Sequence, residues 1–323
     1  MFLRLLILFA TLLLGTQMSA AAQLTKIFYG YSSPESALVL AVGKDKGLFE
    51  RHGIDLQLVQ IRGGSVITQA LIGGSIQIAN ATTPPYLAKV GGVHLTFIAC
   101  NGSRIKVALA AQKGIKRVEQ LKGKTIGSQT LGGRVDFLTQ LLLRKAGLDP
   151  KRDVKMLITG APGDRLMAMK NGITDATVLS AGFLVQAEKA GFEIIDVPAI
   201  EFLREPMFTS PAFLKNHEDQ VTAFLKGLVE SIWYLLNKKE ESLKVIARFM
   251  KSNDADVVEE SYRDVTSVMD RKPYPTEEAI RNLFQMVVAS EPRAQAIDPM
   301  ELWDLALLRR LDESGFIDAL WKR

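Results

Sequence analysis

The feature that most constrains the fold of this chain is an alternation of strand-like and helix-like segments between residues 24 and about 200. Lys26–Tyr31 carries aromatic residues typical of strands, and Glu35–Arg51 follows as an expected helix. Farther along, Thr125–Ser128 has a strand pattern, and Gly133–Ala146 has an apolar stripe at helical spacing. Single strands separated by single helices predict parallel sheets with helices on their faces, which is the α/β class.

The alternation restarts near residue 104, which predicts two sheets, and 323 residues suffice for two domains. Beyond residue 212 long helical runs replace the strand pattern. We therefore expect two lobes, each a mostly parallel sheet with flanking helices, plus a helical C-terminal tail packed on the first lobe. Lobe 1 is expected to comprise residues 23–103 and 207–323, and lobe 2 residues 104–206. The crossovers near Gly102–Ser103 and Arg204–Pro206 are the expected hinges.

Residues 1–22 have the order of a secretory signal peptide. Arg4 supplies the basic start, Leu5–Leu14 the apolar run, and Ser19–Ala22 the small residues of a cleavage site. We expect cleavage near Ala22. The alternative is an uncleaved membrane anchor, but the apolar run is about half of the ~20 residues that span a bilayer. No cysteine lies at the cleavage site, so we expect no lipid anchor and a periplasmic or secreted mature protein.

Composition argues against several classes of function. The net charge is +5, or +4 without Arg4, and no basic cluster is present, so we expect no nucleic-acid partner. Cys100 is the only cysteine and the three histidines are far apart, so we expect neither a metal site nor a cofactor. The segment Gly123–Thr125 lacks the leading glycine of a phosphate-binding loop, and no nucleophile-elbow motif occurs. We therefore expect a protein that is not an enzyme.

Two matching junctions between a strand and a helix are the strongest candidates for a binding site. Gly63-Gly64-Ser65 opens one expected helix, and Gly132-Gly133-Arg134 opens another, one in each lobe. Paired glycines permit close backbone approach, and a helix start offers free N–H groups that suit an anion. A Gly-Gly pair that forms only a tight turn is the alternative. Arg134 and Arg165 are the cations expected near the cleft, and for each the alternative is a solvated surface arginine.

Several stretches together resemble one family of proteins: Gly43–Leu56, Gly63–Ser65 with Gln69–Leu71, Leu121–Gly127, Ala146–Pro150 and Asn171–Ala176. They are similar to segments of the periplasmic solute-binding proteins of ABC importers. The group in question includes the sulfonate, nitrate and taurine receptors and the pyrimidine-precursor binders. The resemblance implies a two-lobed periplasmic-binding-protein type 2 fold, a monomer that closes on a small molecule, and delivery to an ABC permease in the inner membrane.

The resemblance also implies that the loops after the strands line the cleft, and we expect a compact anionic ligand there. The expected ligand-binding residues are Ser32, Ser33, Gly64, Ser65, Thr82, Thr83, Gly132, Gly133, Arg134, Arg165 and Ser180. This chain departs from many relatives at Leu38–Leu40, where they carry an aromatic residue, and at Ser180–Ala181, where they carry proline. Two alternatives stay open: a sensor component that binds without transport, and a pyrimidine-precursor synthase, whose cysteine-rich motif is absent here.

Overall fold

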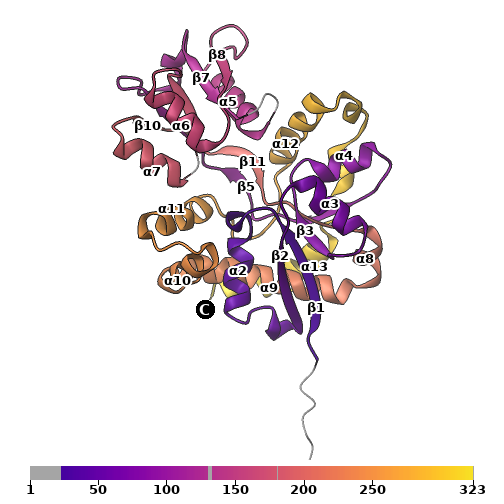
Figure 1. The fold of residues 1–323 in the computed structure, drawn as a ribbon. Helices are drawn as coiled ribbons and strands as arrows, with labels where there is room; N and C mark the ends of the chain where they lie inside the picture. The colour runs from indigo at the N-terminus through magenta and orange to yellow at the C-terminus, as the bar shows by residue number, and fades with distance from the viewer. Residues whose placement is uncertain (1–22, 130–132, 180, 323) are drawn as a thin grey trace, which may run out of the picture.

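The computed structural model describes residues 23–129, 133–179 and 181–322, which form two α/β lobes joined by a pair of crossing strands (Figure 1). The sheet of lobe 1 has the order β2 (Ile54–Gln60), β1 (Thr25–Tyr31), β3 (Ile78–Asn80), β12 (Met207–Thr209) and β4 (Thr96–Ala99). The sheet of lobe 2 has the order β10 (Glu193–Asp196), β6 (Ala108–Ala111), β9 (Ala176–Leu179), β7 (Thr125–Ser128) and β8 (Lys155–Ile158).

Each sheet is mixed, because one strand runs against its neighbours. In lobe 1, β1 is parallel to β2 and β3, whereas β12 is antiparallel to β3 and β4. In lobe 2, β7 is parallel to β8 and β9, whereas β6 is antiparallel to β9 and β10. Both reversed strands directly follow a crossover between the lobes, so the chain enters each sheet in the opposite direction to the other strands. The expectation of mostly parallel sheets therefore holds for the strands outside the crossovers.

The crossovers form a separate two-stranded antiparallel sheet of β5 (Gly102–Ile105) and β11 (Ile200–Arg204). Ser103 ties this sheet to the tail, since its Oγ donates to the carbonyl of Tyr274 and accepts from the N–H of Thr276. Arg204 donates through Nη2 to Asp264 Oδ2 at 2.9 Å. The two places where the chain passes between the lobes thus lie side by side.

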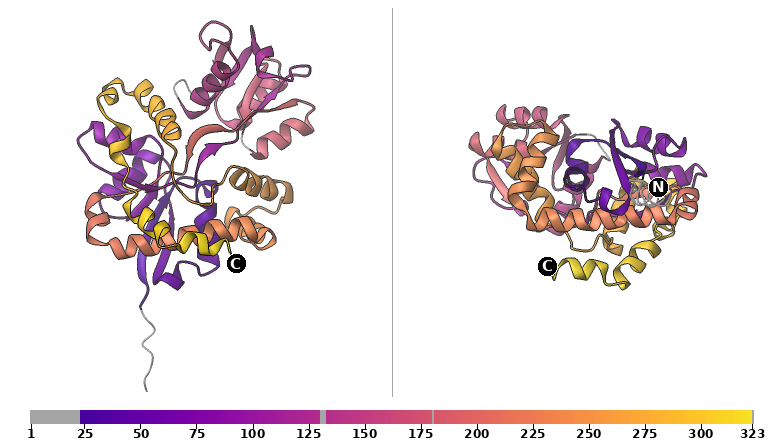
Figure 2. Two further views of the ribbon diagram at one scale, coloured as in Figure 1. Left: turned by 180° about the vertical axis from the view of Figure 1, so that it is seen from behind. Right: turned by 90° about the horizontal axis from the view of Figure 1, so that it is seen from below.

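Helices of the first and last parts of the chain cover both faces of the lobe 1 sheet. One apolar core joins β1 to α2 and α9, and a second core joins α3, α4 and α12 to the crossover strands and to α5 of lobe 2. The helices involved are α2 (Leu38–Asp45), α3 (Gly64–Ile72), α4 (Pro84–Val90), α8 (Pro211–Asn216), α9 (Glu218–Asn237), α10 (Lys239–Met250), α11 (Ala255–Thr266), α12 (Glu277–Ser290), α13 (Ala306–Glu313) and α14 (Phe316–Leu320). Figure 2 shows α13 and α14 on the outside of lobe 1, along α9.

The helices of lobe 2 are α5 (Arg134–Lys145), α6 (Pro162–Lys170) and α7 (Ala181–Lys189). A small core of Leu166, Met169 and Leu179 lies under α6 and α7. The helical tail packs on lobe 1 as expected, but it also reaches lobe 2, because α11 packs against α7. Lys189 Nζ lies 3.2 Å from Asp256 Oδ2 across this contact. The lobes are therefore in contact along α7 and α11 as well as through the crossovers.

Short 3-10 turns complete the chain: η1 (Pro34–Ala37), η2 (Glu50–His52), η3 (Val118–Leu121), η4 (Pro292–Ala296) and η5 (Pro299–Leu302). The expectation of one helix over Glu35–Arg51 was wrong. Gly47 adopts a φ of 64°, and the N–H of Leu48 bonds to the carbonyl of Gly43, which ends α2 before the next turn begins. Across residues 23–129, 133–179 and 181–322, no helix is both long and apolar enough to cross a bilayer.

Candidate functional site

The carboxyl ends of three lobe 1 strands meet at one edge of the sheet, because β2, β1 and β3 are parallel neighbours. The residues that the sequence predicts for lobe 1 follow these strands: Ser32, Ser33, Gly64, Ser65, Thr82 and Thr83. Ser32 and Ser65 are exposed, and the other four are half-buried. Sheets of this kind bind ligands beyond the carboxyl ends of their strands. The fold therefore collects all six residues at the edge where a ligand would lie.

The same arrangement occurs in lobe 2, where β9, β7 and β8 are parallel neighbours. Gly133 caps the start of α5, and Arg134 is the first residue of that helix, just beyond β7. Arg165 lies on α6, which follows β8. Gly132 and Ser180 were also predicted for the site, but they lie outside the described residues. Two loop regions from different lobes thus carry the predicted residues.

Gly64 has a structural role that the sequence did not reveal. A Cβ atom at Gly64 would lie 2.9 Å from Cγ of Pro84 and 3.4 Å from Cβ of Ala81. The start of α3 therefore packs directly on the loop that leads into α4, and a larger residue would push the two apart. Gly63 makes the turn before it with a φ of 95°. Close packing between two candidate loops explains this glycine pair without a ligand.

Arg165 is buried, with 2% of its surface exposed, so the alternative of a solvated surface arginine was wrong. Its Nη1 donates to the carbonyl of Gly160 at 2.8 Å, and its Nη2 donates to the carbonyl of Val178 at 3.1 Å. The side chain therefore ties the ends of β8 and β9 together. Its Nε atom is buried without a hydrogen-bond partner among the described residues, and burial lowers the pKa of the guanidinium. Contact between Arg165 and a ligand stays a prediction.

Arg134 lies between the start of α5 and the crossover strands. Its side chain is exposed, and its Cζ lies 5.8 Å from the ring centroid of Phe202 on β11. The protein that surrounds the guanidinium desolvates it in part and lowers its pKa, while the negative charge of Glu205 acts in the opposite direction. A cation at the first position of a helix is unfavourable, because the helix dipole is positive there. The side chain of Arg134 thus connects the start of α5 to the crossover between the lobes.

Glu205 is a candidate that the sequence analysis missed. It lies between β11 and β12 with a φ of 44°, and its side chain is half-buried. Asn80, the last residue of β3, donates from Nδ2 to Glu205 Oε2 at 2.6 Å and to the carbonyl of Ser36 at 2.9 Å. Burial raises the pKa of the Glu205 carboxyl group, and the charges of Arg134 and Arg204 oppose that increase. An acidic residue at the predicted hinge was the only available sequence signal.

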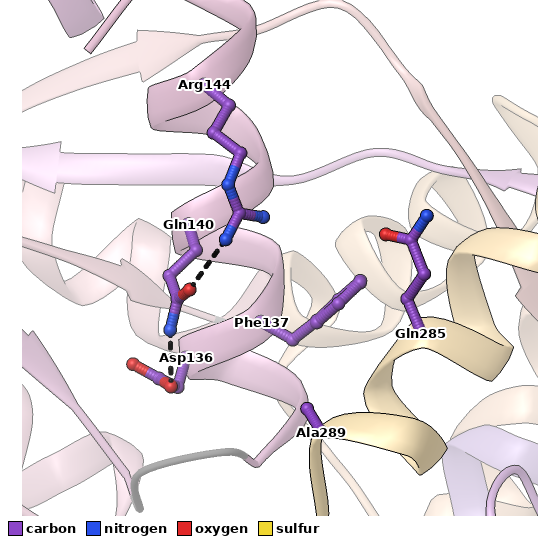
Figure 3. A pocket seen from close by; sticks show the side chains of 6 residues that line it. All are labelled: Asp136, Phe137, Gln140, Arg144, Gln285 and Ala289. Atoms are coloured by element: carbon purple, nitrogen blue, oxygen red, sulfur yellow. Dashed lines mark hydrogen bonds between the residues drawn. The ribbon is translucent and has the colours of Figure 1, made fainter. Parts of the chain in front are cut away.

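A pocket of about 380 Å³ opens between α5 of lobe 2 and α12 of the helical tail (Figure 3). Asp136, Phe137, Gln140 and Arg144 line it from α5, and Gln285 and Ala289 line it from α12. Along α5, Gln140 Nε2 donates to Asp136 Oδ2 at 2.9 Å, and Arg144 Nη2 donates to Gln140 Oε1 at 3.0 Å. The pocket therefore separates a helix of lobe 2 from a helix of the tail, and its width depends on how the lobes sit relative to each other.

Neither cysteine nor metal chemistry is evident in the described part of the chain. Cys100 is fully buried, and its burial raises the pKa of the thiol to about 12, so the reactive thiolate does not form near neutral pH. The described residues contain no group of three or more histidine, cysteine, aspartate or glutamate side chains able to hold a metal ion.

Comparison with known proteins places this fold in a family. The sequence model of the NMT1-like family matches residues 20–250, which is more than half of the chain. The chain belongs to the NMT1-like family. This result agrees with the resemblance to solute-binding receptors that the sequence motifs indicated. The match spans the strands of both sheets and both crossovers, so it includes Asn80, Arg134 and Glu205.

Relatives of this NMT1-like protein are found by sequence and by structure. A Brucella abortus protein provisionally named as a binding protein is 25% identical over 230 residues, covering 69% of this chain and 70% of the relative. The periplasmic aliphatic sulphonate binding protein SsuA of Escherichia coli has a TM-score of 0.68 at 20% identity, covering 86% and 95% of the two chains. The periplasmic nitrate-binding protein NrtA of Synechocystis has a TM-score of 0.61 at 13% identity, covering 90% and 89%. These structures confirm the predicted periplasmic-binding-protein fold.

Proposed function

We propose that this NMT1-like protein is an extracytoplasmic solute-binding protein that captures a small anionic organic molecule between its lobes. The observation that carries the proposal is the position of Arg134. Arg134 carries its guanidinium at a helix start that disfavours positive charge, next to the strands that connect the lobes. A guanidinium in that place can bind a carboxylate, sulfonate or phosphate group through two parallel hydrogen bonds. The N–H groups at the start of α5 would add to the same attraction.

The proposed binding region comprises the loops that follow the strands of both sheets. In lobe 1 it includes Ser32–Ser33, Gly64–Ser65 and Thr82–Thr83, and in lobe 2 it includes 132–134, Arg165 and Ser180. The proposed lobes are residues 23–103 with 207–323, and residues 104–206. Their separate sheets and the two-stranded crossover support this division. A solute that contacts both lobes favours the closed arrangement and shifts the population toward it.

The relatives support the transport part of the proposal. The Brucella abortus relative is named as a binding protein, and the structural neighbours named above bind sulphonate and nitrate in the periplasm. We infer a mature monomer released by cleavage near Ala22, without a lipid anchor, which passes its solute to an ABC permease in the inner membrane. The named binding proteins among the relatives, together with the buried thiol of Cys100, support a function without catalysis.

Thermal unfolding of the purified mature protein tests the proposal. The panel comprises alkanesulfonates, carboxylates, phosphonates, nitrate and sulfate, each in excess over the protein. A solute at a hundredfold excess over its dissociation constant stabilises the native state by about 2.7 kcal/mol. We expect at least one anionic organic solute to raise the midpoint of unfolding in the native protein and to do so less in Arg134→Ala. If no member of the panel changes the midpoint, the proposed function is contradicted.

A further inference from the structure

Glu205 adopts a backbone conformation that is unfavourable for a glutamate followed by a proline. Its φ of 44° lies in the left-handed region, which a side chain with a Cβ rarely adopts, and Pro206 follows it. Lys251 is the other described non-glycine residue with positive φ, and it caps the end of α10, where this conformation is common. Glu205 caps no helix. Residues held in such conformations cluster at binding sites, where the surrounding structure enforces them.

The carboxylate of Glu205 has unused capacity to accept hydrogen bonds. Asn80 is its hydrogen-bond donor among the described residues, although a carboxylate can accept about four bonds. The second oxygen, Oε1, is not among the buried atoms that lack a partner, so it retains contact with solvent. The buried hydroxyl group of Tyr29 has no partner in the described part of the chain, and Glu205 acts on it electrostatically. A hydrogen-bond donor of a ligand could therefore reach Glu205.

The cations around Glu205 do not neutralise it by direct contact. Arg204 is bonded to Asp264: its Nη2 donates to the carboxylate Oδ2, and its Nη1 donates to the backbone carbonyl. Arg134 acts on Glu205 electrostatically. However, no nitrogen of Arg134 or Arg204 lies within 4.0 Å of a carboxylate oxygen of Glu205, which is the limit for an ion pair. The positive charge of Arg134 and the negative charge of Glu205 thus stand close to each other without touching. Two opposite charges that are not paired with each other can each bind the complementary charge of one molecule that carries both.

We infer that Glu205 determines the specificity of the proposed site by accepting a hydrogen bond from an amino or ring N–H group of the solute. This inference rests on the proposed function, in which Arg134 holds the anionic group of the same molecule. The solute class is then a small zwitterion or an anion that bears an N–H donor. A purely anionic analogue offers no hydrogen bond to the Glu205 carboxylate, and the two negative charges repel each other. Sites of this type reject molecules without a donor in this way.

Three matched pairs of solutes test the inference: taurine and ethanesulfonate, β-alanine and propionate, and 2-aminoethylphosphonate and ethylphosphonate. Each pair differs by one amino group. Affinities are measured by calorimetry on the mature native protein, on Glu205→Gln and on Glu313→Gln. Gln keeps an oxygen that can accept from Asn80 but removes the charge. Glu313 is exposed on α13, away from the crossover, so its replacement controls for the lost charge alone.

We expect the aminated member of a pair to bind the native protein and Glu313→Gln about tenfold or more tightly than its partner, and Glu205→Gln to narrow that ratio. Equal binding of both members to the native protein would overturn the inference and leave the proposed function intact. An unchanged ratio in a folded Glu205→Gln would also overturn it. The absence of binding by all six solutes would instead contradict the proposed function. If Glu205→Gln fails to fold, equal binding of both members of each pair to the native protein would still overturn the inference.

Discussion

Asn80 and Glu205 are joined by a hydrogen bond of 2.6 Å from the amide Nδ2 to the carboxylate Oε2. Asn80 ends β3 of lobe 1, and Glu205 lies at the end of the crossover from lobe 2. The bond therefore fixes a charged group of the crossover at the edge of the sheet where the loops of lobe 1 converge. Arg134 of lobe 2 acts on the same carboxylate electrostatically. This pair of residues links the fold to the proposed binding site.

Replacing Arg134 with alanine should weaken solute binding and stabilise the free protein. Loss of a charged hydrogen-bonding group should reduce the binding free energy by about 1.5–3 kcal/mol. Removal of a cation from a helix start should raise the free energy of unfolding by about 0.3–1 kcal/mol. Calorimetry and urea unfolding measure the two quantities. Arg152→Ala is the control, because Arg152 lies beyond the other end of α5. Unchanged affinity in Arg134→Ala would remove Arg134 from the site.

Affinity for an aminated solute should fall as the pH is lowered. Burial raises the pKa of Glu205, so its carboxylate becomes protonated above the usual range for glutamate. In the free protein a raised pKa means that the stability from Glu205 is fully present below its unfolded pKa and is lost as the pH rises through its folded pKa. Solute binding has the opposite pH dependence, because the N–H donor of the solute binds the ionised carboxylate of Glu205. Arg134, Arg204, Asp264 and Tyr29 are the charged and titratable groups that act on or beside Glu205.

Calorimetric titrations of taurine between about pH 7.5 and about pH 4.5 measure this dependence, since the window runs from neutral pH down to the usual pKa of a glutamate. We expect the affinity of the native protein to decrease toward the acidic end. Glu205→Gln carries no titrating group at that position, so its affinity should change much less. An identical pH profile in the two proteins would show that another group is responsible.

Substitution by glycine at Lys251 and at Glu205, the two described non-glycine residues with positive φ, should affect stability and solute affinity differently. Relief of the left-handed conformation gains about 1–2 kcal/mol, and the greater entropy of unfolded glycine offsets about 0.4–1 kcal/mol. Lys251→Gly should therefore stabilise the protein by about 1 kcal/mol in urea unfolding, without any change in solute affinity. Glu205→Gly should lose affinity for aminated solutes without loss of stability. A large destabilisation by Glu205→Gly would mean that the residue serves the fold instead.

Gly64→Ala should destabilise the protein, because the added Cβ would lie 2.9 Å from Cγ of Pro84. Overpacking of this kind costs about 1–3 kcal/mol in the free energy of unfolding. Gly163→Ala provides a matched control on α6, since its nearest neighbour would be a ring atom of Phe183 at 3.6 Å. Alanine favours a helix over glycine, so that control should gain roughly 0.5–1 kcal/mol. Equal effects of the two substitutions would argue against close packing at Gly64.

The sequence predicted those parts of the fold that have a local pattern. β7 begins and ends where the alternation placed it, because short buried runs between turn residues are typical of strands. β5 and β11 were missed, since each is short and pairs with a segment about a hundred residues away. The helix expected over Glu35–Arg51 was too long, because only the three-dimensional structure reveals the left-handed turn at Gly47.

For the candidate site, too, the sequence could indicate local features but not contacts between distant segments. Residues that follow strands, such as Ser32 and Arg134, could be predicted to lie at the carboxyl edges of the two sheets, because parallel strands bring their ends together. Their contact with a ligand stays a prediction. Glu205 could not be predicted as a site residue from the sequence. Its conformation arises where the crossover meets β3 and does not follow from its neighbours in sequence. The tie that Arg165 makes between Gly160 and Val178 likewise depends on contacts between separate strands.

Capture of a solute between the lobes is tested most directly by the distance between Gln140 on α5 and Gln285 on α12. Spin labels on Gln140→Cys and Gln285→Cys report it, because Cys100 is buried and unreactive toward labelling. A Gln140→Cys, Arg152→Cys pair within lobe 2 is the control. We predict that a bound solute shortens the mean distance of the first pair and leaves the second unchanged. The same distance with and without a saturating solute would contradict closure of the lobes around it.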